Sequence, residues 1–405
     1  MHPADPAVPG IGHAARAGGT LRHMTARSRT EEHRASTPLE LFFDLCFVVA
    51  VAQAGGRLVH AVADGDVGHG VVGYLMIFFA IWWAWMNFSW FASAYDTDDV
   101  TYRLTTLVQI VGVLMLAAGV PRAFDNGDFR LTVIGYAVMR LAMVAQWLRA
   151  GAAETGGARR TAFGYAVGVT VCQIGWIALL LPLGAPPVWA FVLMAAAELA
   201  VPPLAERAAP TTWHPSHIAE RYGLFTIIVL GESVSAATVA VQSAVDEHQA
   251  LGDLLPIAAG GLLIVFSAWW IYFAVPIEDH LASNREAFLW GYGHFAVFTA
   301  AAAIGAGLEI AVEQAVGTAD VSVRAASAAV TLPAAVFLFV VWLLHSRHHK
   351  RGLVQQLVLP VSALLVAACT FTGAHAALWA GMVCVATVAL GVFLQTRGPV
   401  VRTTR

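Results

Sequence analysis

Residues 70–92 read GVVGYLMIFFAIWWAWMNFSWFA and contain no charged side chain. A helix needs about 20 mostly apolar residues to cross the hydrocarbon core of a bilayer, and this stretch meets that requirement. Of the 405 residues in the chain, 58% are hydrophobic and only 12% are charged, whereas an ordinary soluble domain carries about 25% charged residues. The mean hydropathy is +0.68. The sequence therefore predicts an all-α integral membrane protein and argues against a soluble multidomain enzyme or a disordered chain.

Twelve segments have the length and composition expected of membrane spans. They cover residues 39–60, 70–92, 102–120, 130–150, 161–182, 187–204, 216–241, 254–275, 287–311, 325–345, 353–371 and 375–395. Short links containing Gly, Pro, Asp or Arg separate them, as is typical of loops. We therefore expect a polytopic bundle of about 12 transmembrane helices.

The basic residues predict how this bundle is oriented. If the N-terminus is cytoplasmic, 17 of the 23 Arg and Lys residues fall on the cytoplasmic side, and only Arg122, Arg130 and Arg324 fall outside. Cytoplasmic loops of membrane proteins carry an excess of Arg and Lys. This bias predicts that both termini are cytoplasmic and that the protein lies in the inner, or cytoplasmic, membrane of the cell.

The two ends of the chain differ from its apolar body. Residues 1–37 contain Pro, Gly, His and Arg without an apolar run, so they lack the central region of a signal peptide. We expect them to form a disordered, basic cytoplasmic tail, and Met24 is an alternative start of the protein. Residues 397–405 form a short cytoplasmic tail in the same prediction.

The chain contains signs of an internal repeat. The first span opens with ELFFDLCFVVA at residues 40–50, and the seventh opens with ERYGLFTIIVL at residues 220–230. Each following span carries a tryptophan pair, Trp82-Trp83 in the first case and Trp269-Trp270 in the second. Six spans per half would give parallel repeats related by an axis along the membrane normal. Chance similarity between apolar, tryptophan-rich helices is the alternative explanation.

The predicted halves are a first membrane repeat and a second one of similar length. They cover residues 38–206 and 207–396. The tryptophan pairs lie at equivalent places in these halves, so they are candidates to line a cavity or to pack between the repeats. An aromatic belt at the membrane interface is the alternative for them.

Several stretches together resemble the bacterial low temperature requirement A family of polytopic membrane proteins. They are Glu40–Val48, Trp82–Trp85 running on to Tyr95–Leu104, and Glu220–Ser233. The resemblance covers about residues 36–395, and it implies a link to growth in the cold without implying a reaction or a substrate. One departure is that the family's Gln and His late in the first span are replaced here by Gln53 and a more distant His60.

Acidic side chains within the spans are candidates for ion or proton binding, because a charged group at the centre of a membrane helix costs about 2.5–3.5 kcal/mol. Glu40 and Asp44 are four residues apart, so they share a helix face and need a cation, an arginine or a shared proton. Glu232 lies twelve residues beyond Glu220, about 18 Å along the helix. We expect these carboxylates to carry protons or cations. The alternatives are a solvated first-turn acid for Glu40 and a protonated, hydrogen-bonded side chain for Glu232.

Arg140 within the fourth span needs an acidic partner. Asp44, Glu198 and Glu232 are the candidates, and the sequence does not choose between them. His294 lies about two turns into the ninth span, where a neutral imidazole is suited either to relaying protons or to packing.

A metal site is a weaker hypothesis. His217 and Glu220 are three residues apart on one helix face, and with His214 they contain ligand types suited to zinc or manganese. A cluster of capping residues at the start of the helix is the alternative explanation. The four cysteines lie in apolar runs and have no C-x-x-C spacing, so they predict neither disulfides nor a zinc knuckle.

These residues favour a secondary transporter or permease that uses intramembrane carboxylates for coupling to protons or cations. The alternatives are an ion channel with its pore between the repeats, and a non-transporting stress sensor or scaffold. No nucleotide-binding loop or nucleophile elbow is found, so we expect neither an enzyme nor a cofactor. The net charge of −3 gives no nucleic-acid footprint. The expected partners are the lipid bilayer and an unidentified small solute or ion.

Overall fold

The computed structural model describes residues 23–28, 31, 34–183, 186–246, 251–349 and 352–396, and these ranges form helices and loops without a β-strand. The long helices are α1 (Pro38–Ala63), α2 (Val67–Tyr95), α3 (Val100–Asn126), α4 (Arg130–Ala153), α5 (Gly156–Leu183), α6 (Val188–Ala205), α7 (Pro215–Asp246), α8 (Leu251–Phe273), α9 (Asn284–Val316), α10 (Val323–Val341), α12 (Leu353–Ala368) and α13 (Ala376–Thr396). The short elements are η1 (Glu278–His280), the π-helical turn η2 (Trp342–Ser346), α11 (Arg347–His349) and η3 (Cys369–His375). The prediction of an all-α polytopic membrane bundle is confirmed.

The number of spans is less firmly defined than the fold class. Within the described residues, ten segments are long and apolar enough to cross a membrane. The tenth runs from Leu353 to Thr396 through both α12 and α13, and α7 is not counted among the ten. The long helices occupy the positions expected from the sequence, but twelve membrane crossings stay a prediction.

Side-chain caps explain where several helices begin and end. Thr37 and Glu40 form a capping box at the start of α1, in which each side chain binds the other residue's backbone N–H. Asp66 and Asp99 cap α2 and α3 by accepting from backbone N–H groups of the first turn. Gly127 ends α3 with φ of +63°, a left-handed conformation that glycine adopts without steric penalty.

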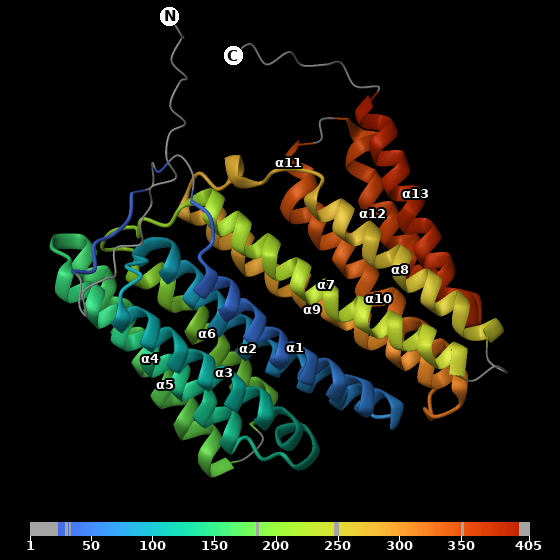
Figure 1. Cartoon of the computed structure of the whole chain (residues 1–405), viewed down its shortest axis with the longest axis horizontal. Coiled ribbons are helices and arrows are strands. Elements are labelled where there is room, and N and C mark those ends of the chain that lie inside the picture. Colours follow the sequence, from blue (N-terminus) through green and yellow to red (C-terminus); the bar gives the residue numbers. More distant parts are fainter. Residues whose placement is uncertain are drawn as a thin grey trace, which may run out of the picture.

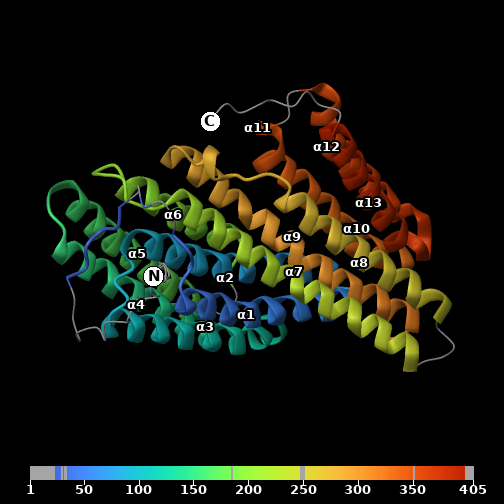
Figure 2. The same ribbon diagram turned by 45° about the horizontal axis from the view of Figure 1, so that its top comes forward.

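The two predicted halves lie side by side, with α1–α6 on one side and α7–α13 on the other (Figures 1 and 2). In the first half α1 packs on α2 and α3, and α3 packs on α4. In the second half α7 packs on α8 and α9, and α9 packs on α10. The halves meet where α1 and α2 contact α7 and α9. This order of neighbours is the one that a duplication would give, although the repeat itself stays a prediction.

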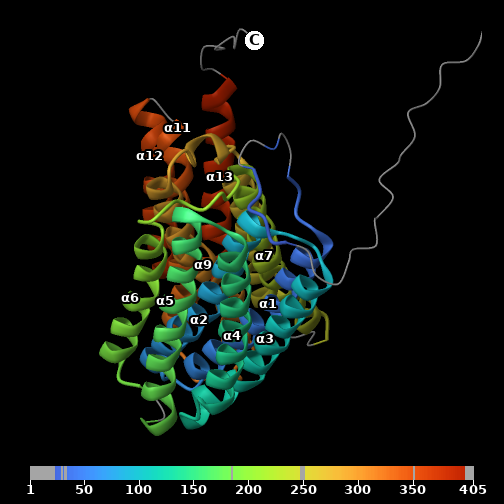
Figure 3. The same ribbon diagram turned by 90° about the vertical axis from the view of Figure 1, so that its left-hand side faces the viewer.

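Successive helices cross the bundle in alternating directions, and Figure 3 shows this for α4, α5 and α6. Contacts between side chains show which helix ends lie together at one end of the bundle. Arg149 near the end of α4 pairs with Asp99 at the start of α3. Asn284 at the start of α9 donates to Glu206 at the end of α6. The start of α1 and the end of α13 lie on this same side (Figure 1), as an even number of crossings requires.

Part of the N-terminal segment packs against this side of the bundle. Met24 is buried, with 1% of its surface exposed. The buried guanidinium of Arg34 donates to the backbone carbonyls of Ala92 and Ser93 at the end of α2. The expectation of a disordered tail over residues 1–37 is therefore wrong for Met24 and Arg34. Backbone carbonyls at a helix end offer the Arg34 guanidinium several acceptors. Residues 1–22 and 397–405 lie outside the described residues.

Small residues let helices approach closely. A Cβ atom on Gly135 of α4 would lie 2.5 Å from the backbone nitrogen of Leu116 in α3, and one on Gly112 of α3 would lie 2.7 Å from the carbonyl oxygen of Gly135. Small residues at such contacts are typical of packing between membrane helices.

Candidate functional site

Four ionisable side chains meet at the contact between the two halves. Glu40 and Asp44 come from α1, and His217 and Arg221 come from α7; all four have 0% of their surface exposed. We call this group the interface cluster. The Arg221 Nη2 atom lies 2.6 Å from Asp44 Oδ1, and its Nη1 atom lies 3.6 Å from Glu40 Oε1. His217 Nε2 lies 3.2 Å from the same Glu40 oxygen.

Helix periodicity explains why these groups meet. Glu40 and Asp44 are four residues apart on α1, and His217 and Arg221 are four residues apart on α7, so each pair occupies one helix face. The capping box fixes the Glu40 carboxylate further, because its Oε2 atom accepts from the backbone N–H of Thr37 at 2.7 Å. Packing of α1 against α7 then brings the two acids onto the two basic groups.

Helix α2 supplies the remaining contacts of the interface cluster. The indole N–H of Trp85 donates to Asp44 Oδ1 at 2.7 Å, and Arg221 donates to the hydroxyl of Ser89 at 3.2 Å. The guanidinium carbon of Arg221 also lies 5.9 Å from the ring centre of Phe88. The interface cluster is thus enclosed by aromatic side chains of α2.

The interface cluster contains one more acid than permanent base. With His217 neutral, Glu40 and Asp44 carry two negative charges against the single positive charge of Arg221. Asp44 Oδ2, His217 Nδ1 and Arg221 Nε are buried and have no hydrogen-bond partner among the described residues. One proton or one monovalent cation would neutralise the group, and burying an uncompensated charge is costly.

Sequence reasoning identified the two acids but missed the role of Arg221. Arg221 lies four residues after His217, which is the same spacing as between Glu40 and Asp44. This spacing could have indicated that Arg221 shares a helix face with His217 and faces the two acids. Trp85 and Ser89 carried no such signal.

The metal-site hypothesis for His214, His217 and Glu220 is wrong. The three side chains have different partners: His217 faces Glu40, Glu220 accepts from the backbone N–H of Ser36 at 3.2 Å, and His214 Nε2 lies 2.9 Å from the carbonyl oxygen of Glu31. No group of three or more His, Cys, Asp or Glu side chains suited to a metal occurs among the residues that the structure describes.

A second buried ion pair lies within the first half. Arg140 of α4 donates to Glu198 of α6 at 2.6 Å, and both side chains are buried. Of the three acids considered for Arg140, the structure selects Glu198. Further donors to this carboxylate come from three other side chains, namely Trp83 at 2.9 Å, Tyr136 at 3.3 Å and Trp176 at 3.3 Å.

His294 belongs to an aromatic cluster of the second half. Its Nδ1 atom lies 2.8 Å from the carbonyl oxygen of Trp290, and its Nε2 atom lies 3.0 Å from the hydroxyl of Tyr272. The ring of His345 lies 5.5 Å from that of His294 and sits in the π-helical turn η2. Both ring nitrogens of His345 are buried.

Glu232 does not join the interface cluster. It lies eleven residues beyond Arg221 on α7, about 16 Å along the helix. It is half-buried, and the described structure gives it no hydrogen bond or ion pair. A Cβ atom on Gly231 would meet nothing within 4 Å, so this glycine does not provide a close helix contact. A shared site of Asp44 and Glu232 is therefore not formed.

The two tryptophan pairs have different environments. Trp82 and Trp83 are buried, with 1% and 0% of their surfaces exposed. Trp269 and Trp270 are 47% and 49% exposed on α8, so the prediction that they line a cavity or the repeat contact is wrong. An outward-facing position is compatible with contact to lipid.

Fold and buried polar groups together define a polytopic α-helical membrane protein with ionisable groups inside its bundle. The chain belongs to the bacterial low temperature requirement A protein family, whose model matches residues 35–393. It is also 26% identical over 302 residues to Uncharacterized protein RA0937 from Rhizobium meliloti (strain 1021), a match covering 68% of this chain and 69% of that protein.

Proposed function

We propose that this protein is a secondary transporter or permease of the cytoplasmic membrane, and that the interface cluster carries its coupling proton or cation. The observation that supports this most strongly is a fully buried group shared by α1 and α7, in which two acids face one permanently charged base, Arg221, and the titratable His217. Binding of one proton or monovalent cation would balance the charge. Release of that ion would restore the uncompensated negative charge of the interface cluster, which favours binding of another ion.

The position of the interface cluster suits coupling to a conformational change. In transporters built from repeats, alternating access arises largely from movement of one repeat against the other. A separation of α1 from α7 would break the Asp44–Arg221 pair, and protonation of Asp44 would weaken that pair. Ion binding and movement would therefore depend on each other. A link to growth at low temperature is part of this proposal and rests on the family's description.

The test is proton movement in liposomes that contain the purified protein. A panel of small metabolites and ions is added outside, and the internal pH is followed with a trapped fluorescent dye. A solute that drives proton movement identifies both the substrate and the coupling. We expect Asp44→Asn to abolish this coupled movement, because an amide takes up no proton in this pH range.

Glu278→Gln is the matched control, because it removes a carboxylate from an exposed residue of η1. We expect this variant to retain wild-type coupling. A Glu232→Gln variant separates two assignments of the coupling carboxylate: retained coupling favours the interface cluster, and lost coupling would move the role to Glu232. Solute movement that is unchanged in Asp44→Asn would contradict the proposal, and unitary currents without coupling would indicate a channel.

A further inference from the structure

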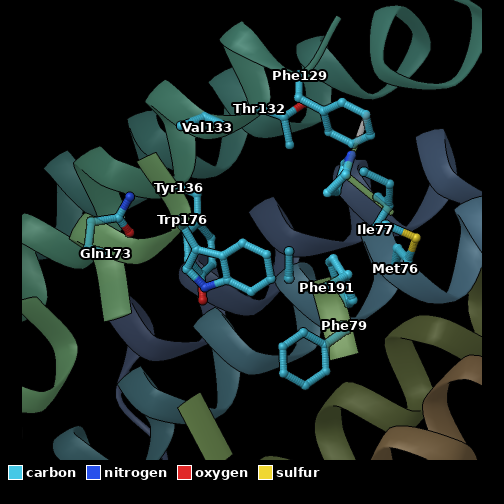
Figure 4. Close-up of a pocket in the computed structure, with 12 residues that line it drawn as sticks. Met76, Ile77, Phe79, Phe129, Thr132, Val133, Tyr136, Gln173, Trp176 and Phe191 are labelled. Carbon is cyan, nitrogen blue, oxygen red and sulfur yellow. The ribbon is translucent and has the colours of Figure 1, made fainter. Parts of the chain in front are cut away.

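An apolar groove lies between the two halves, in the part of the bundle that is farther from the chain termini. Helices α1 and α2 form one wall, and α9 and α10 form the other. Its volume is about 450 Å³, which falls within the range of about 300–1,000 Å³ that is typical of ligand pockets. The pocket inside the first half that Figure 4 shows has a volume of only about 40 Å³. Of these two hollows, the groove is the one with room for a large guest.

The wall of the groove offers apolar surface to such a guest. Among the described residues that line it, none is charged, and only Tyr74 and Thr299 carry a hydroxyl group. The Tyr74 hydroxyl donates to the backbone carbonyl of Thr299 at 2.8 Å, and the Thr299 hydroxyl donates to the carbonyl of Phe295. Both hydroxyls thus have partners within the protein, so a hydrocarbon guest would leave no polar group unsatisfied.

The groove opens toward the lipid-facing surface of the bundle. Val71 and Leu75 on α2 form part of its wall and are also exposed on the outside of the bundle, as are Leu332 and Val336 on α10. In a membrane-spanning helix, exposed apolar side chains face hydrocarbon. Lipid chains therefore have direct access to the groove.

The length of the groove matches one leaflet of a bilayer. Along α10 its lining residues run from Ala325 to Val336, a distance of about 16 Å at 1.5 Å per residue. The hydrocarbon core is about 30 Å thick, so one leaflet contributes about 15 Å. An acyl chain that starts at the membrane surface near Ala325 would fill the groove and end near the middle of the bilayer.

A cation and a second hollow lie beside the start of the groove. Arg324 is exposed in the first turn of α10, and its guanidinium carbon lies 4.7 Å from the ring centre of Phe371 in η3. Both residues line a hollow of about 680 Å³ between α10, α12 and η3, which shares Ala325, Ala328 and Leu332 with the groove. Within the part of the chain that the structure describes, no ion pair involves Arg324.

We propose that this surface binds an anionic phospholipid, with its phosphate at Arg324, one acyl chain in the groove and the other in the adjoining hollow. Two adjoining hollows beside one cation match a molecule with one anionic headgroup and two hydrocarbon chains. A guanidinium binds phosphate through charge-assisted hydrogen bonds. The proposal does not depend on coupled transport, because no residue of the interface cluster lines the groove.

The test of the headgroup is native mass spectrometry of the full chain, titrated in detergent with dioleoylphosphatidylglycerol or dioleoylphosphatidylcholine. We expect the first phosphatidylglycerol to bind about fivefold more tightly than the first phosphatidylcholine, because one arginine at a membrane surface favours anionic lipid by about this factor. Arg324→Gln should bind the two lipids equally. Arg122→Gln makes the same exchange at another exposed arginine of the same end of the bundle and should keep the preference.

The test of the acyl-chain position is Ala328→Phe in the same titrations. Ala328 lines both hollows, so a phenylalanine there would take space that the lipid chains need. We expect binding of both lipids to weaken about tenfold, which corresponds to the loss of about two buried methylene groups. Ala178→Phe makes the same exchange at an exposed position of α5 and should leave binding unchanged.

Three outcomes would overturn the proposal. Equal binding of the two lipids by wild type would mean that no cation selects the headgroup. A preference for phosphatidylglycerol that persists in Arg324→Gln would place the phosphate at another residue. Binding by Ala328→Phe that is as tight as that of wild type would place the acyl chains outside the groove.

Discussion

At the scale of single residues, the two buried acid–base groups have different degrees of hydrogen-bond satisfaction. The Glu198 carboxylate accepts from Arg140, Trp83, Tyr136 and Trp176, so both of its oxygens are occupied. In the interface cluster, Asp44 Oδ2 accepts no hydrogen bond from the part of the chain that the structure describes. A proton added to Glu198 would displace one of its four donors, whereas a proton on Asp44 Oδ2 would displace none. This contrast supports a structural role for Glu198 and a coupling role for Asp44.

The Arg140–Glu198 pair therefore makes a prediction about stability. Arg140→Met should lower the free energy of unfolding by about 3–5 kcal/mol, because it leaves the Glu198 charge buried without its counter-charge. The double variant Arg140→Met/Glu198→Gln should recover part of this loss, since the neutral amide oxygen still accepts from the indoles. The measurement is unfolding of the purified protein by SDS titration.

Arg130→Met is the matched control for that measurement, because it makes the same exchange on α4 at a side chain that is 79% exposed. It should change the free energy of unfolding by no more than about 0.5 kcal/mol. If Arg140→Met were as stable as Arg130→Met, the ion pair would not form in the folded protein.

At the scale of helices, the sequence predicts positions well and partners poorly. The length and composition of a span are local properties, so α1–α10, α12 and α13 lie where the apolar segments indicate. The partner of Arg140 depends on how α4 and α6 pack, and the choice among three acids required the structure. The docking of Arg34 was missed because its neighbours form an irregular polar segment, in which no periodicity indicates a buried face.

The contact between this N-terminal segment and the end of α2 makes stability depend on pH. Burial raises the pKa of Asp96 to about 6; the Glu40 charge acts in the same direction, and Arg34 and Arg27 oppose it. Since an unfolded aspartate titrates near pH 3.9, the folded protein binds this proton more tightly. The stability that Asp96 contributes is thus fully present below about pH 4 and is lost as the pH rises through 6.

We therefore expect wild type to gain about 1 kcal/mol more stability than Asp96→Asn when the pH falls from 7.5 to 5.5. Midpoints of thermal unfolding at the two pH values measure this difference. Asp98→Asn is the control in the same loop, because the Asp98 side chain is 51% exposed. Equal pH responses of wild type and Asp96→Asn would show that Asp96 does not titrate in this range.

At the scale of the whole molecule, two halves meet along α1, α2, α7 and α9, and the interface cluster lies within that contact. The sequence suggested the halves from the repeated openings of α1 and α7. Those same openings contain Glu40, Asp44 and Arg221, and His217 lies within one helical turn of the second opening. The part of the sequence that indicates duplication is thus also the part that joins the halves, as expected if their relative movement is the function.

Orientation in the membrane is the last property that the charge distribution predicts for the whole molecule. Asn126 at the end of α3 and Arg285 at the start of α9 are both exposed and lie at opposite ends of the bundle. Because Arg and Lys concentrate at the end that contains Arg285, that end should be cytoplasmic. In intact cells, a membrane-impermeant maleimide should label Asn126→Cys and should label Arg285→Cys only after lysis. The unaltered chain, whose Cys46 is partly exposed in α1, gives the background. The reverse labelling pattern would place the Arg- and Lys-rich end outside and would contradict the predicted topology.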